Sequence, residues 1–471
     1  MSKAVIYYHD IGDYLPREEK LKVLRQLKSI ANPEIPWKIL SPNEHGDWIS
    51  QRNEGFENYI PMAPEKKFDL RTQTIFSIYA IGISTNRDSW VYNYNQKTIS
   101  KKMSGLIAYY NQQQVQFQNE KQKKPDIDVA DFIENDTTQI SWTRSLKNDV
   151  KNGVIHNYTQ DYCTNSLYRP FCIQNLYFHK PFIESPGLSS TLFPREELEN
   201  KIIVITGIGA SKDFSIIISN KITNLDTLEK SQCFPLYYYE EKTKESPTLF
   251  DAADGAEGDN DYIRRDSISD FILDRAKKQY GKNVTKEDIF YYVYGFLHCP
   301  EYRRTFANDL KKMLPRLPLV ENVKNFWAFS KAGRKLADLH INYEEVPAYP
   351  DLKVTGNDGA STSSASLYLV EKMRFPKKDR KDTIIYNSKI TISNIPEKAY
   401  EYVVNGKSAI EWIMERYQIT VHKESGIKND PNDWAKEHDK PRYILDLLLS
   451  IINVSMQTVD IVKGLPKVSF E

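Results

Sequence analysis

The sequence predicts an α+β fold, with mixed sheets joined by glycine and proline turns and a separate helical subdomain. Short β-branched and aromatic runs recur along the chain and are interrupted by Gly, Pro and Asn, which is typical of strands and turns. From about residue 266 to residue 345 the apolar residues instead recur at helical spacing. With 471 residues, the chain is long enough for two or three domains and a sizeable core.

The composition does not indicate a highly charged partner. The chain has 64 basic and 63 acidic residues, so its net charge is +1 and any basic face must be local. The 30 tyrosines are typical of large half-buried surfaces, although tyrosine also stacks on bases and sugars.

The cysteine pattern and the hydropathy predict a cytoplasmic protein. The four cysteines are widely spaced among apolar residues and include no Cys-x-x-Cys pair, which indicates reduced core thiols rather than disulfides or a zinc site. The first residues do not resemble a signal peptide. The longest apolar segment, Tyr443 to Val454, contains Asp446 and is too short to span a bilayer. We therefore expect a buried helix there and no membrane partner.

The stretch from 202 to 239 reads as strand, glycine turn, strand, loop and strand. The apolar run 202–205 enters the turn GIGASK at 207–212, the run 216–218 leaves it, and the run 234–239 follows a polar connection. A short loop that carries one lysine, Lys212, can bind phosphate, read a base or simply turn the chain.

Known catalytic and nucleotide-binding motifs do not occur in the sequence. It contains no Walker A loop, no GxSxG, no HExxH, no His/Cys metal cluster and no Asn/Asp-Pro-Pro-Tyr. The pair Gly207-Ile208-Gly209 lacks the third glycine of a dinucleotide fingerprint, and a strand rather than a helix follows it, so a phosphate would find no helix N-terminus.

Several short segments present cations on predicted turns or helix faces. The turn TNRD at 85–88 is expected to expose Arg87, and the helix that starts at Trp142 places Arg144 and Lys147 on one face. The ordinary alternatives are a solvated turn and a solvated helix face.

Two further turns are basic. The acidic, glycine-containing excursion at 246–265 ends in Arg264 and Arg265, and the segment FPKKDRKD reads as a hairpin tip. That tip carries Lys377, Lys378, Arg380 and Lys381. Each turn could equally be a solvated connection. The aromatic segment at 162–182 is either a ligand-stacking platform or a core hairpin.

The order of segments resembles the C-terminal specificity region of type ISP restriction-modification enzymes. No segment is diagnostic alone, but the collinear set spans most of the chain. The matching segments are DIGDYLPREEKL (10–21), TNRDSWVYNYN (85–95), SLYRPF (166–171), TGIGASKDFS (206–215), DTLEKSQCFPLYYYEE (226–241), YGFLHCPEYRRTFANDLKKMLPRLPL (294–319), GRKLADLHINYE (333–344) and IPEKAYEYVVNGKSAIEWIMERY (395–417).

The resemblance implies a DNA target-recognition domain that is not catalytic alone. It implies that residues 1–64 are the end of a methyltransferase domain with its connecting segment. Residues 65–471 would be the specificity domain, in two lobes. The opening strand AVIYY would then lack its partner sheet. S-adenosylmethionine, ATP and Mg²⁺ would bind only in upstream domains, so the expected partners are double-stranded DNA and a methyltransferase domain.

On this interpretation, the cations at turns and helix faces would contact phosphates or base edges. The candidates are Arg87, Arg144, Lys147, Lys212, Arg264, Arg265, Lys377, Lys378, Arg380 and Lys381. Two alternatives remain at this stage. One is a scaffold that couples the methyltransferase to a helicase-nuclease, and the other is a nuclease whose site is not recognised, for which no PD…(D/E)xK pattern is evident.

Overall fold

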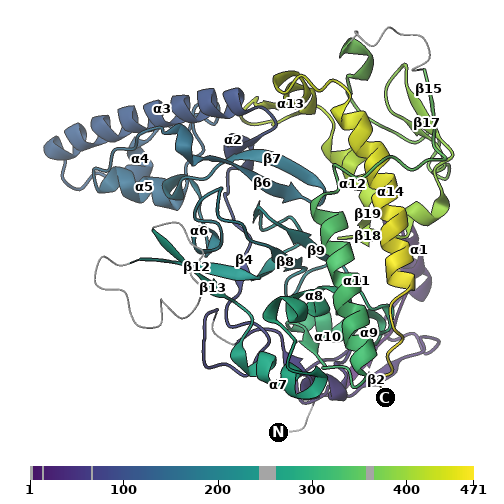
Figure 1. The fold of residues 1–471 in the computed structure, drawn as a ribbon. Helices are drawn as coiled ribbons and strands as arrows, with labels where there is room; N and C mark the ends of the chain where they lie inside the picture. Colours follow the sequence, from purple (N-terminus) through teal and green to yellow (C-terminus); the bar gives the residue numbers. More distant parts are fainter. Residues whose placement is uncertain (1–3, 13–14, 65–66, 243–260, 357–364, 471) are drawn as a thin grey trace. The chain divides into compact units, whose positions relative to one another are not determined.

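The structure is a computed structural model that describes residues 4–12, 15–64, 67–242, 261–356 and 365–470 (Figure 1). It contains two compact units, Met1–Asn58 and Tyr59–Glu471. In the first unit, strand β1 (Ile6–Tyr8) pairs antiparallel with β2 (Lys38–Leu40). Helix α1 (Arg17–Leu27) lies between these strands in sequence, and the 3₁₀ helix η1 (Glu54–Asn58) ends the unit.

Two four-stranded sheets form the centre of the second unit. One has the order β10-β6-β7-β5, in which β6 and β7 are an antiparallel hairpin and β10 runs parallel to β6. The other has the order β4-β11-β8-β9 and is antiparallel throughout. Their strands are β4 (Ala80–Ile81), β5 (Tyr92–Asn93), β6 (Cys163–Arg169), β7 (Cys172–Tyr177), β8 (Ile202–Ile205), β9 (Ile216–Ser219), β10 (Ile222–Thr223) and β11 (Gln232–Pro235).

Smaller antiparallel ladders surround these sheets. They are formed by β3 (Ile60–Pro61) with β14 (Arg316–Leu317), β12 (Tyr237–Glu241) with β13 (Tyr262–Asp266), β17 (Thr391–Ser393) with both β15 (Lys353–Thr355) and β16 (Ile384–Ile385), β18 (Val403–Val404) with β19 (Lys407–Ser408), and β20 (Thr420–Val421) with β21 (Lys428–Asn429).

The first hydrophobic cluster of the second unit joins long helix α3 to its neighbours. Ile99, Leu106 and Tyr110 of α3 pack in it with Leu146 and Val150 of α5. The helices of this region are α2 (Asp88–Val91), α3 (Gln96–Lys123), α4 (Val129–Phe132) and α5 (Arg144–Lys151), and α3, α4 and α5 lie together in Figure 1. The short helix α6 (Ser189–Leu192) instead contributes Leu192 to the second cluster. The β6–β7 hairpin contributes Leu176 and Tyr177 to the first cluster.

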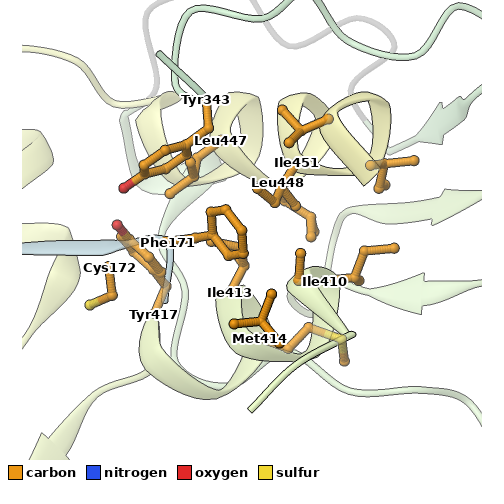
Figure 2. Close-up of a cluster of buried hydrophobic side chains, with 14 of the residues drawn as sticks. Phe171, Cys172, Tyr343, Ile410, Ile413, Met414, Tyr417, Leu447, Leu448 and Ile451 are labelled. Carbon is orange, nitrogen blue, oxygen red and sulfur yellow. The ribbon is translucent and has the colours of Figure 1, made fainter. Parts of the chain in front are cut away.

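The second, larger cluster joins the β6–β7 hairpin to the C-terminal helices. Figure 2 shows Phe171 between Ile413 of α12 and Leu448 of α14, and all three side chains are fully buried. Helices α11 (Val323–Ile341), α12 (Ala409–Arg416) and α14 (Tyr443–Lys463) contribute buried residues to this cluster, and Trp434 of α13 (Pro431–Glu437) packs against it. Between the two sheets and α11 in sequence lie helices α7 (Asp270–Tyr280), α8 (Lys286–Phe296), α9 (Pro300–Thr305) and α10 (Ala307–Lys312). Because the β6–β7 hairpin contributes buried side chains to both clusters, it connects them.

Helices α8 and α11 approach each other through two glycines. A Cβ atom added at Gly333 would lie 1.9 Å from the carbonyl oxygen of Tyr291, and one added at Gly295 would lie 2.2 Å from that of Phe329. Real Cβ atoms do not approach a backbone so closely, so each position has room only for glycine.

The predicted α+β class is confirmed, with three local differences. The run 234–239 is divided between β11 and β12, which belong to different sheets. Within the region predicted to be helical at 266–345, the chain breaks at Phe306 between the short helices α9 and α10. The segment expected to be too short for a bilayer continues to Lys463, and α14 is long and apolar enough by composition to cross one, although most of it is buried in the larger cluster.

Candidate nucleic-acid interface

The ten cationic residues predicted from the sequence do not form one patch. Arg87 and Lys147 line the same cavity, while the others lie on a helix face, a glycine loop, a strand and an exposed turn. Each location is described below by what its side chains contact.

The cavity has a volume of about 660 Å³ and receives walls from four parts of the second unit. One wall is the turn before α2, another is the connection 135–142 with α5, a third is the β6–β7 hairpin, and the last is the β20–β21 hairpin. Its polar and aromatic lining includes Asn86, Arg87, Trp90, Asn135, Trp142, Lys147, Tyr168, Gln174, His422 and Asn429.

Arg87 is buried, with only 3% of its surface exposed, so the expectation that the TNRD turn exposes it is wrong. The turn is fixed because the Thr85 hydroxyl accepts a hydrogen bond from the Arg87 backbone amide at 3.1 Å. None of the three guanidinium nitrogens has a hydrogen-bond partner among the described residues. Burial lowers the pKa of Arg87 to about 10, although the charge of Glu184 opposes the shift.

Lys147 enters the cavity from α5, and Arg144 remains outside it. Thr143 caps the helix through its hydroxyl, and Leu146 and Val150 turn toward the core. Arg144 is exposed, whereas Lys147 is half-buried against the cavity. Neither cation forms an ion pair with any described residue. The two residues predicted to share one face therefore have different surroundings.

Two aromatic rings that line the cavity, Tyr168 and Trp142, differ in how far other side chains cover them. The Arg169 guanidinium lies 4.0 Å from the centre of the Tyr168 ring, and Arg169 also pairs with Asp88 at 3.6 Å. Trp142 donates its indole N–H to the Glu134 carbonyl at 2.8 Å and is only half-buried. Trp142 therefore has ring surface that remains available to a ligand.

The β20–β21 hairpin is held against the central sheet by amide side chains. Asn429 donates to the Gln174 side-chain oxygen at 3.2 Å and accepts from the Tyr94 backbone amide at 3.1 Å. Asn93 donates to the Lys428 carbonyl at 3.2 Å. The amide nitrogen and the amide oxygen of Asn429 are thus both engaged, and these hydrogen bonds fix this wall of the cavity.

Lys212 lies on a glycine loop whose anion-binding groups are already occupied. The Glu229 carboxylate accepts from the backbone amides of Ser211 and Lys212 at 2.9 and 3.0 Å. Gly207 passes so close to residue 230 that an added Cβ would lie 2.0 Å from the Lys230 carbonyl oxygen. The loop therefore cannot cradle a phosphate with these amides, and its exposed Lys212 ammonium, which has no partner among the described residues, is the group left for a ligand.

Arg264 and Arg265 lie on strand β13, not at a loop tip as expected. The Arg264 guanidinium is 4.5 Å from the centre of the Tyr237 ring, and Arg265 pairs with Glu240 at 3.1 Å. Both are half-buried. Most of the preceding excursion falls at 243–260, outside the described residues.

The basic turn at 377–381 is exposed, and two of its four cationic side chains form ion pairs with carboxylates. Lys377 and Lys378 have no side-chain partner among the described residues, whereas Arg380 pairs with Asp382 at 3.3 Å and Lys381 with Glu411 at 2.9 Å. Lys377 and Lys378 are therefore the better phosphate candidates of the four.

Sequence reasoning missed most of the cavity. Trp142 had been noted only as the start of a helix, and Gln174, His422 and Asn429 had not been noted as candidates. Tyr168 belongs to the aromatic segment for which a stacking platform and a core hairpin were both considered, and this segment is the buried β6–β7 hairpin. The spacing of these residues along the chain gives no signal, because the cavity joins segments more than 250 residues apart.

In the described ranges, no His, Cys, Asp or Glu side chains form a group that could hold a metal ion.

The described residues thus form a polar cavity and, elsewhere on the second unit, present the exposed and unpaired lysines Lys212, Lys377 and Lys378. The chain belongs to the family of the Type ISP C-terminal specificity domain, whose model matches residues 74–447.

Solved structures of larger proteins share this fold over the whole chain. A nuclease-deletion mutant of the Type ISP restriction-modification enzyme LlaGI, in complex with a DNA substrate mimic, is 38% identical with a TM-score of 0.83. The ATP-dependent Type ISP enzyme LlaBIII bound to DNA is 33% identical with a TM-score of 0.84, and DrdV in a DNA complex is 28% identical with a TM-score of 0.80.

The chain is much shorter than these proteins. The matches cover 100%, 100% and 99% of this chain, but only 40%, 28% and 44% of the LlaGI, LlaBIII and DrdV chains respectively. Comparison with curated proteins gives no significant match.

Proposed function

We propose that the chain recognises a specific sequence in double-stranded DNA, as the specificity part of a Type ISP restriction-modification enzyme. The observation that carries the proposal is the match of the specificity-domain family over residues 74–447, together with similarity over the whole of this chain to parts of the LlaGI and LlaBIII structures that contain DNA. The chain is proposed to be non-catalytic on its own and to act in the cytoplasm.

The distribution of charge supports this function despite the net charge of +1. Phosphate contacts need a few mobile, unpaired cations rather than a basic protein. Lys212, Lys377 and Lys378 are exposed and unpaired among the described residues, whereas Arg265, Arg380 and Lys381 are already paired with carboxylates. The first three are the proposed phosphate contacts.

A methyltransferase domain is the proposed protein partner, with residues 1–64 as its end and connecting segment. This proposal rests on the resemblance of the segment 10–21 and on the shorter length of this chain relative to its structural neighbours. S-adenosylmethionine, ATP and Mg²⁺ are proposed to bind in the upstream domains of such an enzyme. No residue of this chain is assigned to these cofactors.

Selection from a random duplex pool, followed by titration of the selected site, tests the proposed function. We expect one asymmetric sequence to be enriched and its affinity to fall steeply as salt rises, because phosphate contacts release counterions. Absence of binding to any duplex at low salt would contradict the proposal and favour a scaffold. Metal-dependent cleavage by the purified chain would instead favour a nuclease.

A further inference from the structure

We propose that the segment after helix α14, residues 464–470, is a strap that holds the chain where it enters the second unit, and that one side chain, Phe470, fastens this strap. Phe470 inserts into an aromatic socket, which is formed by Tyr59, Phe296, Tyr302 and Phe306. Tyr59 is the first residue of the second unit. The strap therefore connects the end of α14 to the start of the same unit.

The ring of Phe470 contacts all four socket residues. Its centre lies 5.3 Å from that of Phe306, 5.9 Å from that of Tyr302, 6.3 Å from that of Tyr59 and 6.4 Å from that of Phe296. Three of these contacts are edge-to-face, with interplanar angles of 78°, 79° and 83°, an arrangement that aromatic pairs favour. Phe296, Tyr302 and Phe306 are buried, whereas Phe470 is half-buried. One ring thus closes a socket whose walls belong mainly to the core.

The socket is tied to the strand by which the chain enters the unit. Phe306 lies at the break between α9 and α10, and its ring is 5.6 Å from that of Tyr59. The Tyr302 hydroxyl donates to the Arg316 carbonyl at 2.9 Å, and the Arg316 guanidinium donates to the Tyr59 carbonyl at 3.3 Å. Arg316 belongs to β14, which pairs with β3 directly after Tyr59. Release of Phe470 therefore removes contacts from the residues that hold the entry strand.

The strap is held by side chains rather than by backbone hydrogen bonds. Half-buried Pro466, Val468 and Phe470 alternate with exposed Lys467 and Ser469, so one edge of an extended segment faces the protein. These five residues form no hydrogen bond and no ion pair with any described residue. Segments with few hydrogen bonds and little buried surface open locally at low free energy. The strap is thus built to open without unfolding of the unit, and the Phe470 ring is the main contact that opposes opening.

Hydrogen exchange of the 471-residue chain tests the strap. In Phe470→Ala, we expect the backbone amides of residues 59–63 to exchange about tenfold faster, because the ring contact that holds Tyr59 is lost. The Met62 amide, which donates to the Pro315 carbonyl at 2.9 Å, reports on this region. Lys467→Ala, an exposed position in the same segment, is the matched control and should exchange as the wild type does. Phe470→Tyr, which keeps the ring, should also retain slow exchange.

Two further variants identify the fastening contact. A chain that ends at Pro466 should show the same acceleration as Phe470→Ala, because the ring provides most of the docking. In the background of Phe306→Leu, Phe470→Ala should add little further acceleration, since the two rings contact each other and their effects are coupled. The β20–β21 hairpin, which contributes no residue to the socket, should exchange at the wild-type rate in every variant.

Each possible result supports or overturns the strap. Wild-type exchange at residues 59–63 in both Phe470→Ala and the shortened chain would overturn the inference. Faster exchange in the shortened chain than in Phe470→Ala would show that Val468 or the backbone fastens the segment, which contradicts the role of Phe470. Acceleration that includes the β20–β21 hairpin would mean that the ring supports the whole unit, and would overturn a strap that opens locally. None of these measurements involves DNA, so each outcome is independent of the proposed function.

Discussion

The backbone amide of Lys212 donates a hydrogen bond to the side-chain carboxylate of Glu229, 3.0 Å away. The same carboxylate accepts from the amide of Ser211 and from its hydroxyl, each at 2.9 Å. An internal carboxylate thus fills the position that a phosphate would take in a glycine-rich cradle. These hydrogen bonds hold the backbone of the loop in place, and the exposed Lys212 side chain extends from it without a partner among the described residues.

Lys212→Ala is expected to weaken DNA binding equally for all sequences. Because its ammonium would neutralise one phosphate, the slope of log affinity against log salt should become shallower by about 1. Titration of the selected duplex at several salt concentrations measures this slope. Lys212→Arg keeps the charge and should retain the wild-type slope. Unchanged affinity and sequence preference in the alanine variant would show that Lys212 contacts only solvent.

Glu229→Ala is expected to loosen the glycine loop without unfolding the chain. Hydrogen bonds from the Ser211 backbone hold the pKa of Glu229 below its usual range. Because the folded-state pKa is the lower one, these bonds stabilise the loop at neutral pH and are lost as pH falls through that pKa. Hydrogen exchange of residues 207–213 should accelerate in the variant at pH 7. Asp226→Ala, in the same connection, is the control, and equal exchange in both would contradict the role of Glu229.

Replacing the unpaired lysines of the basic turn should change DNA affinity more than replacing its paired lysine. Lys377→Ala with Lys378→Ala is expected to lower DNA affinity and to reduce the salt slope by up to about 2. Lys381→Ala should leave the slope nearly unchanged, because Glu411 already balances that charge at 2.9 Å. Fluorescence anisotropy over a salt series compares the two variants. A larger slope change for Lys381→Ala would mean that the ion pair opens on DNA.

His340 is expected to make the fold sensitive to acid. It is fully buried between the Tyr294 hydroxyl at 2.6 Å and the Thr458 hydroxyl at 2.9 Å, and burial lowers the pKa of His340 to about 3. An unfolded histidine takes up its proton near pH 6.5, so stability falls as pH drops from about 6.5 toward 3. The expected loss from this group is about 2 kcal/mol at pH 5 relative to pH 7.

Urea unfolding of wild type and His340→Gln at pH 7 and pH 5 measures that loss. The variant should lose less stability between the two pH values, even if it is less stable at pH 7. His438→Gln, which replaces an exposed histidine, is the control. An equal loss of stability in His340→Gln and wild type would exclude His340 as the acid-sensitive group.

Gly333→Ala is expected to destabilise the fold by about 3 kcal/mol, because the added methyl would meet the Tyr291 carbonyl and force α8 and α11 apart. Thermal unfolding measures the effect. Gly105→Ala is the matched control, because Gly105 lies inside α3 with nothing within 4 Å of an added Cβ. A variant at 333 that is as stable as the one at 105 would contradict the close packing of α8 and α11.

The fold was predictable where local pattern and burial agree. The α+β class, the 202–218 hairpin, helix α5 and the helices α7 and α8 of the region 266–345 follow from periodicity and turn chemistry. Boundaries that depend on packing were missed. Leu236 separates two sheets within one aromatic run, and α14 extends past the apolar core segment because its last turns need only one buried face.

The candidate site was less predictable than the fold. A cation in a polar turn is normally solvated, yet Arg87 is buried, and the cavity at its turn is lined by segments as distant in sequence as Asn135 and Asn429. Whether a lysine is free or paired also depends on distant residues, as Glu411 shows for Lys381. Local sequence therefore nominated cations as a type of residue but could not rank them, and the DNA contact of each one stays a prediction.

The participation of α14 in the larger cluster limits where this domain can be cut for engineering. The family match ends at residue 447, within α14, whereas buried residues of the cluster continue to Val459. A transplant of DNA specificity that ended at the family boundary would leave Leu448, Ile451 and Ile452 behind and expose Phe171 to water. Chimeric enzymes should therefore exchange the chain through the end of α14, and begin no later than Ile60, whose strand pairs with Leu317.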